Sequence, residues 1–137
     1  MKDETLQLKE AYRALEKAQR NYEVMREWLY SNQLGYPICR FFLRRHYQKI
    51  VVYGGGEIGL LLCQEILSQK QLMLQYVIDQ KQQVLPLPVK VYQCFQHNIP
   101  YDIIVVTPDF DYSMIRNELV LQGAGNIVSI KDVIINA

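Results

Sequence analysis

The feature that most constrains the fold is a glycine-rich turn that separates an apolar run from a helical pattern. Residues 49–53 (Lys-Ile-Val-Val-Tyr) are short, apolar and rich in β-branched side chains, which is typical of a buried strand. Residues 57–70 carry leucines and isoleucines at helical spacing. Between them, Gly54, Gly56 and Gly59 fit the pattern G-x-G-x-x-G. The sequence therefore predicts a strand that enters a helix through this turn.

Each glycine of the pattern has its own physical role. Gly54 permits the tight turn, Gly56 allows a phosphate group to approach the backbone, and Gly59 lets the helix pack close to the strand. The first turn of the helix offers unpaired N–H groups and a positive dipole end to an anion. Asp79 stands twenty positions beyond Gly59, at the end of the next apolar run. Because an acid at this place accepts hydrogen bonds from ribose hydroxyls, the context predicts the first unit of a Rossmann-type nucleotide-binding domain.

The ligand site is expected beyond the carboxyl ends of the strands. The candidate site residues are Gly54, Gly55, Gly56, Glu57, Ile58, Gly59, Asp79 and Thr107. Asp79 either binds a ribose or caps a turn before Gln80, and Thr107 either bonds a ligand or ends its strand. Glu57 stands where a pyrophosphate would lie, so its carboxylate would have to point away, although the helix dipole explains a first-turn acid equally well.

Strands alternate with helices through the rest of the chain. Further strands are predicted at 72–79, 89–92, 101–107 and 126–130, and further helices at 38–46, 112–122 and 131–135. Asp109 or Asp111 is expected to cap the helix at 112–122, and residues 93–98 are too few for a crossover helix. The pattern predicts an α/β fold, with a Rossmann-like parallel sheet of about five strands in order 3-2-1-4-5 and an N-terminal helical extension.

The extension (residues 1–47) precedes the predicted nucleotide-binding domain (residues 48–137) and begins with one long helix. Residues 5–30 contain no glycine or proline. Apolar residues alternate steps of three and four at Leu8, Ala11, Leu15, Ala18, Tyr22, Met25 and Leu29. This heptad pattern fits two arrangements equally: the helix packs on its own domain, or it pairs with a second copy of the protein or another partner. Trp28, beside the pattern, fits either arrangement.

Composition excludes several classes of protein. A formal net charge of +1 gives no reason to expect nucleic acid or a membrane surface as partner. The first residues lead into no apolar segment typical of a signal peptide, and no apolar run is long enough to span a bilayer. The three cysteines are scattered without metal-ligand spacing, which argues against a zinc site and a disulfide framework. A reducing cytoplasm is therefore the expected location.

Catalytic residues are few. No tyrosine is followed four residues later by lysine, so the usual proton-transfer pair of short-chain reductases and epimerases is absent. His46 and His97 lie outside the predicted site and are expected to be surface or capping groups. Tyr53 and Tyr76 are expected to be packing residues. Whether the protein is an enzyme stays open at this point.

Four segments resemble a known group of domains: residues 50–59, 76–79 and 101–107, and the closing Ile-Val-Ser-Ile-Lys-Asp-Val-Ile. They are similar to small Rossmann-like domains of bacteria, encoded beside or fused to glycosyltransferases and other sugar-modifying enzymes of surface-polysaccharide assembly. The nucleotide-sugar-binding N-terminal domains of bacterial amino-sugar acetyltransferases look similar too. The resemblance covers residues 45–135 well and the first helix only loosely.

The resemblance implies a ligand but no reaction. In the acetyltransferase relatives the glycine turn and the acid after the second strand hold a nucleotide sugar, which implies Gly54, Gly56 and Asp79 here. The hexapeptide-repeat half that transfers the acetyl group is absent from this chain. A glycosyltransferase catalytic domain is absent as well, so neither transfer is implied.

Three functions remain open from the sequence. The first is an accessory module that binds NAD(H) or a nucleotide sugar in polysaccharide biosynthesis. Its helical extension would mediate self-association or docking to a sugar-pathway enzyme. The second is a small NAD-dependent oxidoreductase or epimerase-type enzyme that takes a proton-transfer residue from a partner. The third is a degenerate Rossmann scaffold that only binds other proteins.

Overall fold

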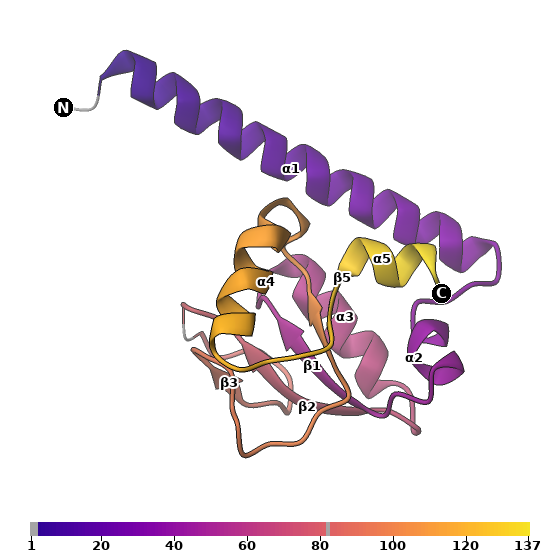
Figure 1. Ribbon diagram of the computed structural model, residues 1–137. Helices are drawn as coiled ribbons and strands as arrows, with labels where there is room; N and C mark the ends of the chain where they lie inside the picture. The colour runs from indigo at the N-terminus through magenta and orange to yellow at the C-terminus, as the bar shows by residue number, and fades with distance from the viewer. Residues whose placement is uncertain (1–2, 82) are drawn as a thin grey trace.

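The computed structural model describes residues 3–81 and 83–137 and shows an α/β fold built on one parallel sheet (Figure 1). The strands are β1 (Lys49–Tyr53), β2 (Met73–Ile78), β3 (Val91–Tyr92), β4 (Ile103–Val106) and β5 (Ile127–Ser129). They lie in the order β3-β2-β1-β4-β5, and every neighbouring pair is parallel. The predicted fold class and strand order are confirmed.

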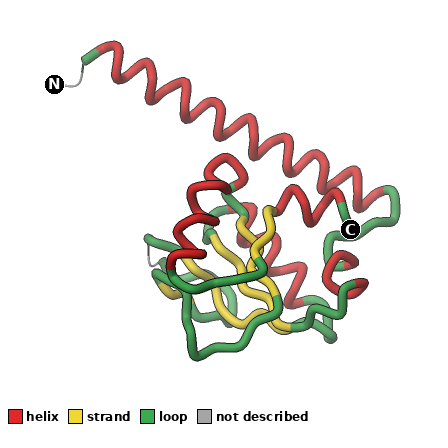
Figure 2. Tube along the Cα trace, in the orientation of Figure 1, coloured by secondary structure: helices red, strands yellow, loops and turns green. Residues whose placement is uncertain are grey.

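The helices lie on both faces of the sheet. They are α1 (Glu4–Gln33), α2 (Arg40–Arg44), α3 (Glu57–Leu67), the 3₁₀ turn η1 (Asp109–Asp111), α4 (Tyr112–Leu121) and α5 (Ile130–Ile135). One core cluster joins α1, α2, α3 and α5 to one face of the sheet, and a second joins α4 to the other face. Figure 2 shows the strands between α4 and the other helices. Because β1 and β4 are covered on both faces, they read as continuous apolar runs in the sequence.

An aromatic loop takes the place of a crossover helix between β3 and β4. The chain forms no helix from residue 93 to residue 102, as the short segment predicted. The ring of Phe95 packs edge-on against those of His97 and Tyr101, with centroids 4.9 and 5.4 Å away. The backbone N–H of Gln96 donates a hydrogen bond to the buried hydroxyl of Tyr76. These side chains cover the sheet face that a helix would otherwise cover.

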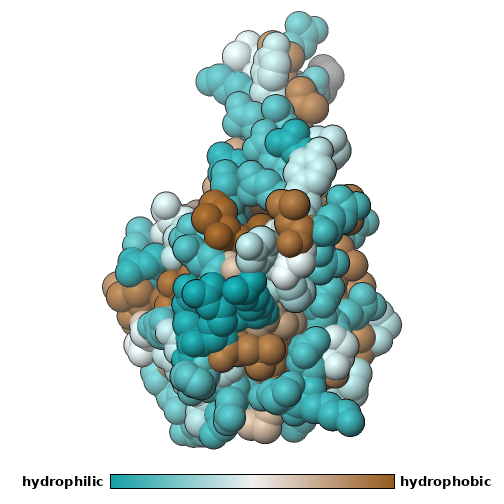
Figure 3. Space-filling view, turned by 90° about the vertical axis from the view of Figure 1, so that its right-hand side faces the viewer, coloured by the Kyte–Doolittle hydropathy of each residue, from teal (hydrophilic) through white to brown (hydrophobic). Residues whose placement is uncertain are grey.

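The long helix α1 packs on the core of the domain through its C-terminal half. Val24 and Trp28 belong to the core cluster that contains α3 and the sheet, and Trp28 is only 8% exposed. Trp28 therefore lies in the intramolecular core. The first turns of α1 extend past the domain (Figure 1), and the helix rises from it as a narrow stalk (Figure 3). Within the described residues, no helix is both long and apolar enough to cross a bilayer.

Two helices are shorter than the sequence predicted. The segment predicted at 38–46 is helical only from Arg40 to Arg44, because His46 adopts a positive φ of 57° that no α-helix allows. The helix predicted at 57–70 ends at Leu67. There, the hydroxyl of Ser68 donates to the carbonyl oxygen of Glu65 at 2.6 Å and satisfies one of the last carbonyl groups.

Candidate functional site

The glycine turn has the geometry that its pattern predicts. Gly54 has a φ of +106°, and a Cβ atom there would strike the Thr107 side chain and Pro108. A Cβ atom on Gly59 would overlap the carbonyl oxygen of Gly54. Gly56 differs, since a Cβ atom built there would meet nothing within 4 Å. The first and third glycines are thus required by packing, and the second leaves open space at the start of α3.

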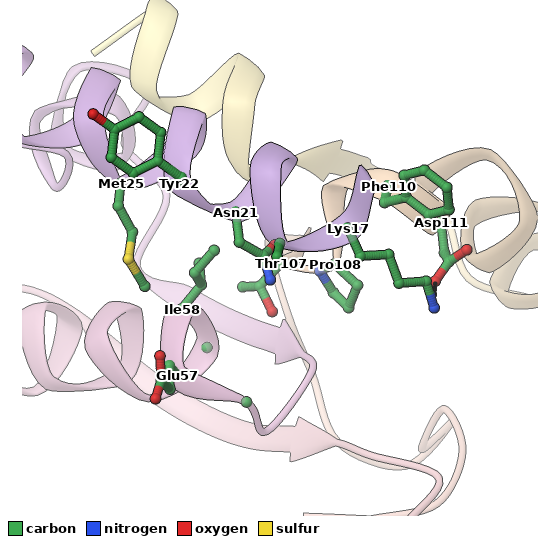
Figure 4. Close-up of a pocket in the computed structure, with 13 residues that line it drawn as sticks. Lys17, Asn21, Tyr22, Met25, Glu57, Ile58, Thr107, Pro108, Phe110 and Asp111 are labelled. Atoms are coloured by element: carbon green, nitrogen blue, oxygen red, sulfur yellow. Dashed lines mark ion pairs between the residues drawn. The ribbon is translucent and has the colours of Figure 1, made fainter. Parts of the chain in front are cut away.

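A cavity of about 570 Å³ lies beyond the carboxyl ends of β1 and β4 (Figure 4). Its walls come from α1 (residues 17–25), the start of α3 (residues 56–59) and the segment after β4 (residues 107–111). The sheet order changes direction between β1 and β4, which is where ligands bind in open α/β sheets. The fold therefore places a cavity at the expected position.

The cavity brings together five of the eight predicted site residues. Those that line it are Gly56, Glu57, Ile58, Gly59 and Thr107. Figure 4 shows Ile58 pointing toward α1, while Glu57 lies farther from α1. The other three, Gly54, Gly55 and Asp79, do not line this cavity.

Asp79 holds the glycine turn in place. Its Oδ2 atom accepts hydrogen bonds from the backbone N–H of Gly55 at 2.9 Å and from Nε2 of Gln83 at 2.8 Å. Its Oδ1 atom accepts from the backbone N–H of Lys81 at 2.9 Å, which caps the turn around Gln80. Of the two roles that the sequence left open for Asp79, the structure therefore shows the capping of this turn. The ribose role stays a prediction, and the carboxylate keeps one lone pair, on Oδ1, that could serve it.

Thr107 joins the ends of the two central strands. Its backbone N–H and its hydroxyl both donate to the carbonyl oxygen of Tyr53, at 3.0 and 2.8 Å. The side chain is buried and also lines the cavity. Its hydroxyl proton is therefore engaged, which leaves Thr107 able to accept a hydrogen bond from a ligand.

Three basic side chains of α1 hold the cavity wall formed by η1. Nη1 of Arg20 lies 2.8 Å from Oδ2 of Asp109, and this hydrogen bond and charge raise the pKa of Arg20. Arg13 and Lys17 contact the two carboxylate oxygens of Asp111 at 3.3 and 3.2 Å. The prediction that one of these aspartates caps α4 is wrong: Asp111 occupies the N-cap position but makes no capping hydrogen bond with its side chain.

The same contact includes a ring between the two aspartates. The charged groups of Arg13 and Lys17 lie 5.4 and 5.7 Å from the ring centre of Phe110. A cation near an aromatic face is attracted to it, so Phe110 strengthens the docking of α1. Sequence reasoning missed this contact because basic residues at spacing four and three on a long helix usually face solvent. The signal was the acid-aromatic-acid segment that follows β4.

The histidines and the two tyrosines that flank the predicted site do not line the cavity. His46 and His97 are exposed, and neither lines it. Burial raises the pKa of Tyr53 and of Tyr76, so neither phenol exchanges protons near neutral pH, and both lie in the core as predicted. Among the described residues, no three His, Cys, Asp or Glu side chains gather to hold a metal ion.

Comparisons of this chain with protein-family models, with curated proteins and with solved structures found no match. The class of protein is therefore defined by the fold itself, an α/β domain with a five-stranded parallel sheet and a long N-terminal helix. Its function has to be inferred from the cavity and the glycine turn.

Proposed function

We propose that this protein is a nucleotide-binding module that holds the phosphate groups of NAD(H) or a nucleotide sugar at the start of α3. The observation that carries the proposal is the cavity between Gly56 and Thr107, open on the side of Gly56 where a phosphate would approach. The first turn of α3 supplies N–H groups without helical partners and a positive dipole end. Both attract an anion at this place.

The dimensions and walls of the cavity support a small organic ligand. Its volume of about 570 Å³ lies within the range of about 300–1,000 Å³ that is common for ligand sites. Ile58, Met25 and Phe110 give it apolar walls, against which a base or sugar ring can pack. Asp79, which follows β2 and accepts a hydrogen bond from the glycine turn, would accept one from a ribose that reaches over Gly55.

The cellular role that we propose follows from the sequence resemblance. The module would serve beside a glycosyltransferase or another sugar-modifying enzyme of bacterial surface-polysaccharide biosynthesis, in the cytoplasm. It would present a nucleotide-linked substrate or respond to a bound nucleotide. The three free cysteines are compatible with that compartment. An oxidoreductase or epimerase needs a group that transfers a proton to or from the substrate. These enzymes are less favoured, because Asp111 is engaged in ion pairs, and Glu57 is the only cavity-lining acid that makes no ion pair within the described residues.

A second candidate is a scaffold that binds no nucleotide. It is favoured by the carboxylate of Asp79, which already accepts three hydrogen bonds, and by Glu57, whose negative charge stands beside the expected phosphate. In this case the cavity would be a consequence of how α1 docks on η1.

Ligand binding to paired variants separates the two candidates. The unfolding temperature and calorimetric affinity would be measured with NAD, NADP, ADP, CDP, UDP and nucleotide sugars. A ligand at a hundred times its dissociation constant adds about 2.7 kcal/mol to the free energy of unfolding. Gly56→Asp should abolish binding by charge repulsion, yet it should fold, because φ at Gly56 is −76° and aspartate is a favoured N-cap residue.

The matched control is Gly125→Asp, far along the chain from the glycine turn. Gly125 has no positive φ, and its Cβ atom would make only an ordinary contact at 4.0 Å with the Tyr101 hydroxyl. This variant should bind like the wild type. No stabilisation by any of these compounds, or equal binding by Gly56→Asp, would contradict the nucleotide proposal and favour the scaffold.

A further inference from the structure

One stripe of the heptad pattern of α1 is exposed, although Met25 of the same pattern packs partly on the core and lines the cavity. Leu8, Leu15, Tyr22 and Leu29, spaced by seven residues, are 56%, 63%, 63% and 55% exposed. The helix contacts the domain through a different stripe, which contains Val24, Trp28 and the basic residues that bind η1. Packing on the domain therefore accounts for Met25 but not for these four exposed side chains.

We name as the seam the seven residues of this pattern, Leu8, Ala11, Leu15, Ala18, Tyr22, Met25 and Leu29. It runs along roughly 33 Å of helix, at 1.5 Å per residue. Tyr12 and Tyr30 lie next to it and are also more than half exposed. Large apolar side chains that recur on one exposed face of a helix are a candidate interaction surface.

We propose that the seam binds the seam of a second copy of this chain, so that two α1 helices form a short coiled coil. Leucines and tyrosines recur at one heptad position, and Ala11 and Ala18 at the other allow close helix approach. The same surface on both copies is complementary to itself, as the two-fold interface of a homodimer requires.

The distribution of charge supports a second copy over a foreign helix. Charged residues at the positions beside a heptad seam normally select the partner of a coiled coil. Between Leu8 and Leu29, only Arg26 occupies such a position, and its guanidinium lies 5.8 Å from the ring centre of Tyr22 in the same chain. The other charged residues occupy the outer positions: Lys9, Glu10, Arg13, Glu16, Lys17, Arg20, Glu23 and Glu27. Two identical seams therefore meet without like-charge repulsion and without a charge pattern that favours another partner.

The seam offers large exposed side chains to a second copy. Stable interfaces bury about 800 Å² on each partner. Six large side chains, each more than half exposed, lie on or beside the seam: Leu8, Tyr12, Leu15, Tyr22, Leu29 and Tyr30. The first turns of α1 project beyond the domain, so a second helix can reach them (Figure 3). A projecting helix of this kind gains most of its stability from packing, which the second copy supplies.

The test is the mass of the full-length chain in solution, measured by sedimentation equilibrium over a range of concentrations without added nucleotide. The chain has a mass of 16.1 kDa, and we expect the wild type to sediment at twice this value. Leu15→Glu should raise the dissociation constant about a hundredfold or more, because it places a charge in the seam of both copies. Leu121→Glu is the matched control, since Leu121 is an exposed leucine on α4, outside the seam, and this variant should stay dimeric.

Amide hydrogen exchange of residues 4–16 gives a second measurement that does not depend on mass. We expect protection that increases with concentration in the wild type and in Leu121→Glu, and that is lost in Leu15→Glu. Thermal unfolding of Leu15→Glu checks that the domain is intact, which we expect because the side chain is mostly exposed. A wild type that stays at 16.1 kDa at every concentration, or a Leu15→Glu variant that still dimerises, would overturn the proposal. Because these measurements contain no nucleotide, a failure of the dimer proposal leaves the nucleotide-binding proposal untouched, and the two can be told apart.

Discussion

Gly59 packs directly against the carbonyl oxygen of Gly54, so that the first turn of α3 rests on the backbone of the glycine turn. A Cβ atom on Gly59 would overlap this oxygen and would also lie 3.2 Å from Oγ1 of Thr107. One residue thus joins three elements, namely the end of β1, the start of α3 and the end of β4. The shape of the cavity depends on this contact, because Gly59 and Thr107 both line it.

We predict that Gly59→Ala lowers the free energy of unfolding by about 3 kcal/mol, because backbone atoms cannot yield to a methyl group as flexible side chains do. Urea denaturation followed by circular dichroism measures the change. Gly125→Ala adds the same methyl group at a position where it makes only an ordinary van der Waals contact with the Tyr101 hydroxyl. This substitution should change the free energy of unfolding by less than about 0.5 kcal/mol. Equal effects of the two substitutions would show that Gly59 and Gly54 are not in tight contact.

Asp79 offers a second test, since its carboxylate accepts two backbone N–H groups around the glycine turn. We predict that Asp79→Ala costs about 2 kcal/mol of stability, because it leaves the N–H groups of Gly55 and Lys81 without their acceptor. Gln83→Ala removes one exposed side-chain donor, shared between this carboxylate and the carbonyl oxygen of Gly55, and should cost less than about 0.5 kcal/mol. Chemical denaturation of both variants without ligand is the measurement. If Asp79→Ala leaves the free energy of unfolding unchanged, the carboxylate does not stabilise the turn, and a role in ligand binding is favoured.

Asp102 makes stability depend on pH. Its Oδ2 atom accepts hydrogen bonds from the backbone N–H groups of Lys49 and Gln48, at 2.8 and 2.7 Å, and these bonds lower the pKa of the carboxyl. A lowered folded-state pKa stabilises the fold above the ordinary aspartate pKa of about 3.9, and this contribution is lost as the pH falls through the folded value. We therefore predict that Asp102→Asn destabilises the protein at pH 7 and much less in acid.

Urea midpoints measured from neutral pH to below about pH 4 follow this difference between Asp102→Asn and the wild type. The two curves should converge on acidification. A constant gap between them would show that ionisation of Asp102 contributes nothing to folding.

The three thiols should differ in reactivity. Cys39 and Cys63 are buried, and burial raises the pKa of each to about 12, whereas Cys94 is exposed. Because the thiolate is the reactive form, we predict that an aromatic disulfide reagent labels one thiol per native chain and all three after denaturation. Cys94→Ser should abolish the native labelling. Rapid labelling of the native Cys94→Ser variant would contradict the packing around α2 and α3.

The sheet was predictable because its signals are local. The apolar run before Gly54 and the one at 103–106 are continuous, since both faces of these strands are covered. The glycine pattern then placed the turn, and the Rossmann-type first unit favoured the strand order that the structure shows. The ends of α2 and α3 were less predictable, because a positive φ at His46 and a capping hydroxyl at Ser68 depend on local geometry that several sequences allow.

The cavity wall was not predictable, because it depends on contacts between distant segments. The heptad pattern has the same appearance whether it faces a domain or solvent. The contact of Arg20 with Asp109 joins residues that are 89 positions apart. In the sequence, Arg20 has the pattern of a solvated charge and Asp109 that of a helix cap, so nothing near either of them indicates the other.

The position of α1 has a consequence for regulation. A helix is a nearly rigid rod, so the stripe that binds η1 and the seam, whose Tyr22 and Met25 also line the cavity, cannot move independently. Lys17, on the cavity wall, lies only two residues along the rod from Leu15, on the seam. Any event at the seam that shifts or rotates the rod therefore reshapes the cavity. Thermodynamic linkage makes such coupling reciprocal, so a change in affinity at one surface is matched by an equal factor at the other.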